Sequence, residues 1–251
     1  MKIFFISAAI SMMGTGIVIG AEYSNDFSGI STTSYTSNPD LNSFSNRFDS
    51  WGVYGSGEGS SRLTDETATG GSEGVVDAAV EGQFFGLVDT YNPEHKADVS
   101  ITFEINLDRA EYYQVSIDMG AYGLFEDTDS DHILWTYRFG NGEEKVIFNL
   151  KPSTEHTVQY QFASGSVVES DRPLVFKQAD VYHNTSLSNG LSTYRSNFDG
   201  EEGTLYITMK GRIDGSKEAY VFDNLKVASF IPEPGSFLLI LVGLLGVSKR
   251  D

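Results

Sequence analysis

The 251-residue sequence contains no cysteine and only four histidines. The missing cysteine excludes disulfides, a thiol nucleophile and cysteine-based zinc sites. The histidines are isolated from one another, so no paired spacing offers a zinc site of the His-x-x-x-His kind. They are His95, His132, His156 and His183. A Gly-x-x-x-x-Gly-Lys phosphate-binding loop is absent as well. We therefore predict a protein that is not an enzyme.

Positive charge is also scarce, because 17 lysines and arginines face 35 aspartates and glutamates. The net charge of −18 repels nucleic acid and anionic lipid, which excludes nucleic acid as an expected partner. The same excess of carboxylates is compatible with binding divalent cations such as calcium, although an acidic surface is usually only a solvated one.

The N-terminus has the pattern of a secretory signal peptide. Lys2 supplies the positive start, an apolar stretch follows, and small residues precede Glu22. We predict export by the general secretion machinery, with signal peptidase cutting between Ala21 and Glu22 and removing residues 1–21. An uncleaved anchor is the alternative.

The C-terminus has a second short apolar segment, residues 237–247. Even with its small flanking residues it is roughly 21 Å long as a helix. A bilayer core is about 30 Å thick, so the segment is short for a permanent anchor. Before it, Pro232 and Pro234 favour an extended backbone. After it, Lys249 and Arg250 favour the cytoplasmic side.

The order Pro232-Glu233-Pro234, apolar segment and basic end resembles the PEP-CTERM sorting signal of Gram-negative bacteria, over residues 231–251. The resemblance implies a short transmembrane helix, transient anchoring in the inner membrane, and processing by an exosortase, a membrane transpeptidase. The protein would then reach the cell surface or the extracellular polysaccharide matrix. Two features depart from the typical signal: the basic end contains only two basic residues, and the acidic Asp251 follows them. A tail anchor and a buried core helix are the alternatives.

Residues 22–230 are predicted to form one all-β domain, an antiparallel, jelly-roll-like β-sandwich. Apolar and polar residues alternate from Ile101 to Leu107, which places one face of a strand in the core. The alternation recurs in segments 115–119, 158–162 and 205–209. Segments 133–139 and 145–150 are predicted to form a hairpin, with positive φ angles at Asn141-Gly142. Polar or glycine-rich segments 31–46, 55–74 and 184–199 are predicted to be loops.

The ends of this domain, residues 23–27 and 219–227, resemble the first and last strands of galactose-binding-like and carbohydrate-binding jelly-roll modules. The resemblance implies a structural calcium ion shared by Asp26 and Asp223. The alternative for Asp223 is an edge-strand aspartate that faces water.

Three alternating aspartates, Asp127, Asp129 and Asp131, follow Glu126 and form another candidate calcium loop. An EF-hand is excluded, because His132 and Arg138 stand where glycine and glutamate are required. A solvated acidic turn and a calcium site of another kind both stay open.

Two tryptophans are present. Trp135 lies in an alternating strand and is predicted to be core, whereas Trp51 has a freer context and is a candidate for stacking on a sugar. The leading interpretation is a non-enzymatic exported surface or matrix protein. The alternatives are a calcium-stabilised carbohydrate-binding module, which predicts polysaccharide as a partner, and a polysaccharide-degrading enzyme.

Overall fold

The computed structural model describes residues 17–28, 35–44, 49–55, 62–64, 74–75, 82–93, 95–107, 110–126, 130–178 and 181–232. These residues contain strands and turns and no helix. None of the described segments is a helix long and apolar enough to cross a membrane.

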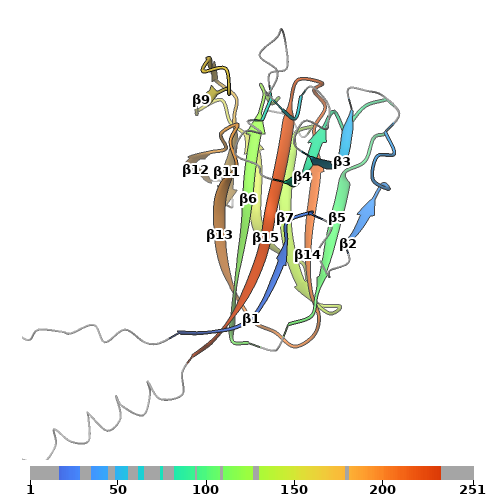
Figure 1. Ribbon diagram of the computed structural model, residues 1–251, viewed down its shortest axis with the longest axis vertical. Helices are drawn as coiled ribbons and strands as arrows, with labels where there is room; N and C mark the ends of the chain where they lie inside the picture. Colours follow the sequence, from blue (N-terminus) through green and yellow to red (C-terminus); the bar gives the residue numbers. More distant parts are fainter. Residues whose placement is uncertain are drawn as a thin grey trace, which may run out of the picture.

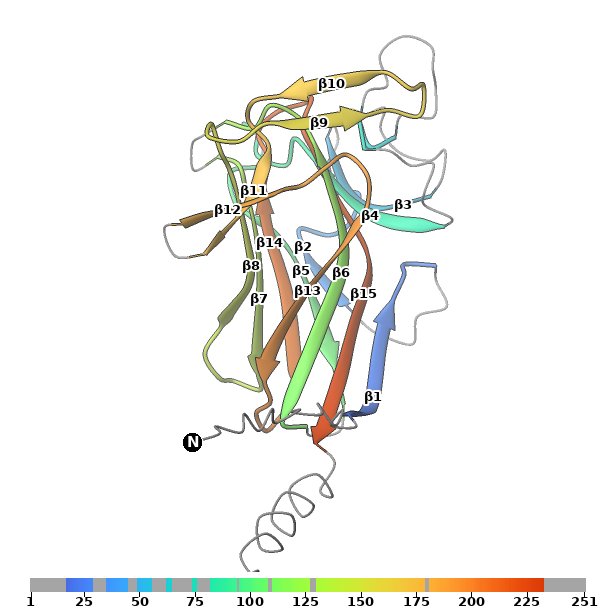
Figure 2. The ribbon, with the colours of Figure 1, turned by 90° about the vertical axis from the view of Figure 1, so that its left-hand side faces the viewer.

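Two antiparallel sheets lie face to face (Figures 1 and 2). The first has the order β13 (Ser192–Asp199), β6 (Tyr112–Tyr122), β15 (Ala219–Pro232), β4 (Gln83–Val88) and β3 (Ser50–Gly55), with β1 (Ile17–Asn25) also paired to β15. The second has the order β12 (Val181–Ser186), β11 (Leu174–Gln178), β8 (Lys145–Pro152), β7 (His132–Phe139), β14 (Leu205–Arg212), β5 (Val99–Ile105) and β2 (Tyr35–Asn38). The predicted all-β antiparallel sandwich is confirmed.

A separate hairpin lies across one end of the sandwich (Figure 2). It consists of β9 (Val158–Gln161) and β10 (Val167–Ser170), which pair only with each other among the described strands. The connection from β6 to β7 and the connection from β14 to β15 lie at this same end, so three non-adjacent parts of the chain meet there (Figures 1 and 2).

The alternating residues fill the space between the sheets. Ile101, Phe103 and Ile105 of β5 are buried, and so are their counterparts in β6 and β14. Trp135 of the second sheet is fully buried and donates a hydrogen bond from Nε1 to the hydroxyl of Tyr220 in the first sheet, at 2.9 Å. This bond satisfies both polar groups inside the core. The core position predicted for Trp135 is confirmed.

Trp51 also lies in the core. Its side chain is fully buried, its ring packs edge-on against Phe85 at 4.7 Å, and its Nε1 donates to the carbonyl of Pro39 at 2.9 Å. The expectation that Trp51 is free to stack on a sugar does not match this burial. The strand β3 turns its tryptophan inward, where a large apolar ring removes the most surface from water.

The predicted hairpin is confirmed as β7 and β8. Its positive φ angle, however, falls on Gly140 at 51° rather than on Asn141-Gly142. Two predicted loops were wrong in part, because segment 31–46 contains β2 and segment 184–199 contains all of β13. Strand β13 is an edge strand with mostly exposed side chains, so it lacks the apolar alternation that reveals a half-buried strand.

The two ends of the described chain pair with each other. In the β1–β15 pair, Ile17 lies opposite Pro232, and the register shifts between Ile19 and Glu22. The predicted cleavage point between Ala21 and Glu22 falls at this irregularity, and Glu22 to Asn25 pair with β15 beyond it. Both predicted domain boundaries therefore lie within this pair. Glu233, Pro234, Lys249 and Arg250 lie outside the described residues.

A candidate metal centre beside a pocket

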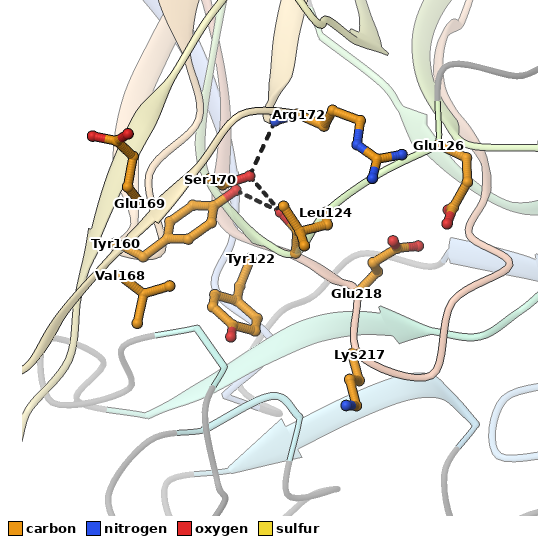
Figure 3. A pocket seen from close by; sticks show the side chains of 11 residues that line it. Tyr122, Leu124, Glu126, Tyr160, Val168, Glu169, Ser170, Arg172, Lys217 and Glu218 are labelled. Atoms are coloured by element: carbon orange, nitrogen blue, oxygen red, sulfur yellow. Dashed lines mark hydrogen bonds between the residues drawn. The ribbon is translucent and has the colours of Figure 1, made fainter.

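A pocket of about 320 Å³ opens where the β9–β10 hairpin meets the sandwich (Figure 3). Its walls come from the end of β6, from the hairpin and from the connection between β14 and β15. The lining residues are Tyr122, Gly123, Leu124, Glu126, Tyr160, Val168, Glu169, Ser170, Arg172, Lys217 and Glu218. This volume lies at the lower end of the range for ligand sites, about 300 to 1,000 Å³.

Two hydrogen bonds fix the hairpin wall. The hydroxyl of Tyr160 and the Oγ of Ser170 both donate to the carbonyl of Gly123, at 3.2 and 2.9 Å. The ring of Tyr160 is buried and lies 5.0 Å from that of Tyr122, which is only partly buried. A rigid aromatic wall results.

The rim of the pocket is apolar on two sides. Leu124 is 49 % exposed and Val168 is 38 % exposed, so both offer apolar surface at the opening. Arg172, Lys217 and Glu169 supply charged groups around the same opening. The pocket therefore combines apolar and hydrogen-bonding surface.

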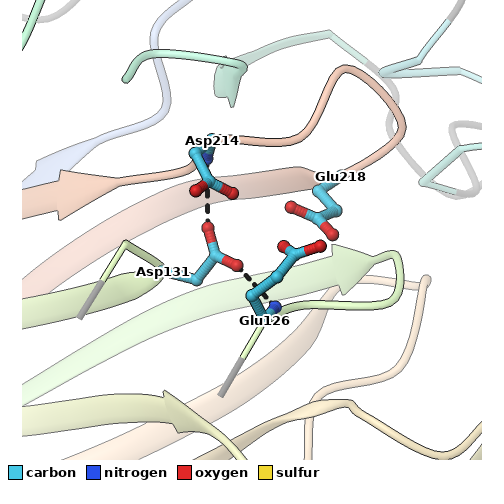
Figure 4. Close-up of side chains that lie close together, drawn as sticks. All are labelled: Glu126, Asp131, Asp214 and Glu218. Carbon is cyan, nitrogen blue, oxygen red and sulfur yellow. Dashed lines mark hydrogen bonds between the residues drawn. The ribbon is translucent and has the colours of Figure 1, made fainter. Parts of the chain in front are cut away.

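One wall of the pocket continues into a cluster of four carboxylates, Glu126, Asp131, Asp214 and Glu218 (Figure 4). One oxygen of each side chain lies within 4.8 Å of the corresponding oxygens of the other three. Glu126 and Asp131 come from the connection between β6 and β7, whereas Asp214 and Glu218 come from the connection between β14 and β15. We call these four residues the acidic cluster.

Asp131 holds the two connections together. Its side chain is fully buried; Oδ2 accepts a hydrogen bond from the backbone N–H of Glu126 at 2.7 Å, and Oδ1 accepts one from that of Asp214 at 3.0 Å (Figure 4). Both neighbouring carboxylates are positioned through these bonds, because each belongs to the residue that donates the N–H. Asp131 is thus the organising residue of the acidic cluster.

Glu218 projects into the acidic cluster from a tightly packed position. It is only 4 % exposed, and its Oε2 has no hydrogen-bond partner among the described residues. Two glycines make room for it: a Cβ on Gly215 would overlap Oε2, and a Cβ on Gly123 would lie 2.5 Å from the Cγ of Glu218. The Oε2 of Glu126 is likewise buried and unpartnered in the described structure.

The crowded carboxylates shift each other's pKa values. Burial, aided by the charges of Asp131, Glu126 and Asp214, raises the pKa of Glu218 to about 10. Burial also raises the pKa of Asp131 to about 7, against the opposing effect of its two backbone hydrogen bonds. The pKa of Asp214 is raised by burial and by Glu126. An isolated buried carboxylate is strongly disfavoured, so a cation at the centre would relieve all four groups.

The donor set fits calcium. Calcium is a hard cation that takes six to eight oxygen ligands and is held mainly by aspartate and glutamate carboxylates. Zinc favours nitrogen and sulfur ligands, and the acidic cluster offers neither. The four residues named above are those that would hold the ion.

Of the three alternating aspartates predicted as calcium ligands, the structure describes one. Asp131 is part of the acidic cluster, whereas Asp127 and Asp129 lie outside the described residues. The Glu126–Asp131 segment therefore supplies two residues of the acidic cluster. The other two, in the connection from β14 to β15, were not predicted from the sequence. Asp214 and Glu218 carry no recognisable spacing, and their contact with Glu126 arises only from the chain topology.

Asp26 and Asp223 were predicted to share a calcium ion. Asp223 is only 6 % exposed, so the alternative of a water-facing aspartate does not fit. Burial raises its pKa to about 7, to which the charges of Asp118 and Asp26 contribute, and its Oδ1 has no partner among the described residues. Asp26 accepts hydrogen bonds from the backbone N–H and the Oγ of Ser28, which lower its pKa. Calcium sharing by these two residues stays a prediction.

No family model matches the sequence, and no curated protein matches it. Among solved structures, the chain is similar to the CBM22-1 xylan-binding domain of Paenibacillus barcinonensis Xyn10C, with 12 % identity over 84 % of this chain and 96 % of that one and a TM-score of 0.34. It is also similar to the K3 cleaved adhesin domain of Lys-gingipain from Porphyromonas gingivalis, with 11 % identity over 82 % and 98 % and a TM-score of 0.34. At these scores the comparisons assign neither a family nor a ligand.

Proposed function

We propose that the protein is an exported, non-catalytic module that binds carbohydrate in the pocket, with a calcium ion held in the acidic cluster. The observation that carries this proposal is the shared wall: Glu126 and Glu218 belong both to the acidic cluster and to the lining of the pocket. An ion there would fix the wall against which a ligand binds.

The pocket offers the two surfaces that a sugar requires. The partly buried ring of Tyr122 and the exposed Leu124 and Val168 can cover an apolar sugar face. Glu169, Arg172 and Lys217 around the opening can exchange hydrogen bonds with hydroxyls. Small-molecule sites typically combine an apolar lining with a few polar groups in this way.

Glycan binding can be tested with the secreted protein on a glycan array in the presence of calcium. The informative variant is Tyr122→Ala, and its matched control is Tyr112→Ala at the opposite end of the same strand, where the ring is 45 % exposed. We expect signal from the native protein and the control, and loss of signal from the pocket variant. A blank array with native protein, or equal signal from Tyr122→Ala, would overturn the proposal.

A polysaccharide-degrading enzyme is the second candidate, because carboxylates do converge beside an aromatic pocket. Glycosidases use two carboxyl groups at a defined separation, whereas this cluster holds four in mutual proximity, a pattern that suits a cation better. The assay is release of reducing ends from the polysaccharides that bind. Release that disappears in Glu126→Gln would favour the enzyme.

Delivery to the cell surface is the other part of the proposal, and it rests on the sequence of residues 231–251. An exosortase-like transpeptidase would process the chain after the Pro232-Glu233-Pro234 motif, and the sandwich would then reach the surface or matrix, where polysaccharide is available. Mass spectrometry of the exported protein should find the segment after about Pro234 missing. An intact Arg250 on surface material would count against processing.

A further inference from the structure

The calcium ion proposed for the acidic cluster would face the pocket, because Glu126 and Glu218 belong to both. We infer that the ion binds the glycan directly, through two adjacent hydroxyls of a neutral sugar. This inference rests on the proposed function and assigns to the ion a role in recognition as well as in stability.

The acidic cluster leaves coordination positions of calcium open when each carboxylate binds through one oxygen. The ion takes six to eight oxygen ligands. Both oxygens of Asp131 already accept backbone hydrogen bonds, and the nearby carbonyl of Gly123 already accepts two hydroxyl donors. Four carboxylates that each give one oxygen leave about two to four positions for other ligands.

The open positions lie on the side of Glu126 and Glu218. Each of these side chains has a buried Oε2 without a hydrogen-bond partner in the described structure, and both line the pocket. Glu218 is 4 % exposed and points toward Glu126 (Figure 4). On the opposite side, Asp131 and its two backbone bonds close the cluster. Among the described residues, the pocket is therefore the side from which we expect a ligand to reach the ion.

The charges select a neutral ligand. When all four carboxylates are ionised around the ion, their charge exceeds that of one calcium ion, so the occupied cluster keeps a negative charge. Of the other charged groups that line the pocket, Arg172 and Lys217 are positive and Glu169 is negative, which does not reverse this balance. A uronate or a phosphate would be repelled, whereas two adjacent sugar hydroxyls supply neutral oxygens at a spacing that suits one cation. Tyr122 lies within the same pocket to cover the sugar ring.

The experiment uses terbium as a luminescent substitute for calcium in the exported protein. Luminescence lifetimes in H₂O and D₂O report how many water molecules the ion holds. The probes are the methyl glycosides of glucose, mannose and galactose, their 2,3-di-O-methyl derivatives, which lack adjacent free hydroxyls, and methyl glucuronide. We expect a binding glycoside to displace about two waters, and the derivatives and the glucuronide to bind at least about tenfold more weakly.

Two further arms separate the inference from the proposed function. Glu104→Gln, which changes an exposed carboxylate on β5 outside both the pocket and the acidic cluster, should leave the displacement of water intact. If sugar binds but the water count is unchanged, or if binding persists in chelator with the fold intact by circular dichroism, the direct contact is overturned and carbohydrate binding stands. If none of the glycosides and no glycan on the array binds with calcium or terbium present, the proposed function fails and the inference fails with it.

Discussion

Glu126 and Glu218 are distant in the sequence, yet their carboxylate oxygens lie within 4.8 Å of each other and both side chains line one pocket. The connection between β6 and β7 and that between β14 and β15 meet at the same end of the sandwich, and Asp131 joins them through hydrogen bonds to Glu126 and Asp214. Ion binding and ligand binding are therefore expected to be coupled.

Calcium should stabilise the native protein, and Glu218→Gln should remove most of that gain. At a calcium concentration 100 times the dissociation constant, the free energy of unfolding should rise by about 2.7 kcal/mol. The variant replaces a ligand oxygen of the acidic cluster by an uncharged amide. Thermal unfolding in calcium and in chelator measures the difference. Glu169→Gln is the control, and an equal calcium gain in Glu218→Gln would contradict the site.

Gly215→Ala should weaken calcium binding without unfolding the protein. A Cβ at this position would overlap the Oε2 of Glu218 and push the carboxylate from its place. Gly190→Ala is the matched control, because nothing lies within 4 Å of a Cβ there. Calorimetric titration with calcium should show at least about a tenfold loss of affinity for Gly215→Ala. Native affinity in this variant would mean that Glu218 is not a ligand.

Asp223→Asn should stabilise the protein in chelator above neutral pH. Burial, followed by the charges of Asp118 and Asp26, raises the folded-state pKa of Asp223 from 3.8 to about 7. A raised pKa means that this residue contributes most below its unfolded-state pKa, and that the contribution is lost as pH rises through about 7. The advantage of Asn should therefore grow between pH 4 and pH 8, reaching about 1–3 kcal/mol.

Urea unfolding of both proteins across this pH range measures the effect. A constant difference between native protein and variant would show that Asp223 does not titrate as described. The same variant tests the predicted pairing of Asp223 with Asp26: if those two share a calcium ion, Asp223→Asn should become the less stable protein once calcium is added.

Trp51→Ala should damage the fold rather than the binding surface. The side chain is fully buried against Phe85, so truncation should cost about 3–5 kcal/mol. Chemical denaturation gives this value directly. The fraction of Trp51→Ala that stays folded should bind glycan like the native protein, whereas Tyr122→Ala should stay fully folded and bind none. A folded Trp51→Ala protein that had lost binding would return this residue to the ligand site.

The sequence was sufficient for the fold class and for much of the core. Period-two alternation identified β5, β6 and β14, because one face of each strand is buried and the other is not. Strand β13 was missed because it is an edge strand whose inner face mixes Tyr194 and Phe198 with serines, which weakens the apolar alternation. Trp51 was misplaced because the few residues around it show no periodicity from which its direction could be derived.

The sequence indicated only two of the four residues of the acidic cluster. Glu126 and Asp131 lie in a segment in which acidic residues alternate, and this pattern led to the prediction of a calcium site there. Asp214 and Glu218 lie in an ordinary connection between strands, and only the packing of the two sheets brings them within reach. Sequence spacing reports local geometry, whereas this cluster depends on contacts between residues far apart in the chain.

The most direct test is a crystal structure of the exported protein grown with calcium, with anomalous scattering measured and terbium used in a second crystal. We expect one strong anomalous peak among Glu126, Asp131, Asp214 and Glu218, about 2.3–2.6 Å from their oxygens for calcium, with the open side of the ion toward the pocket. Crystals grown in calcium that show these four carboxylates well ordered and no peak between them would contradict it.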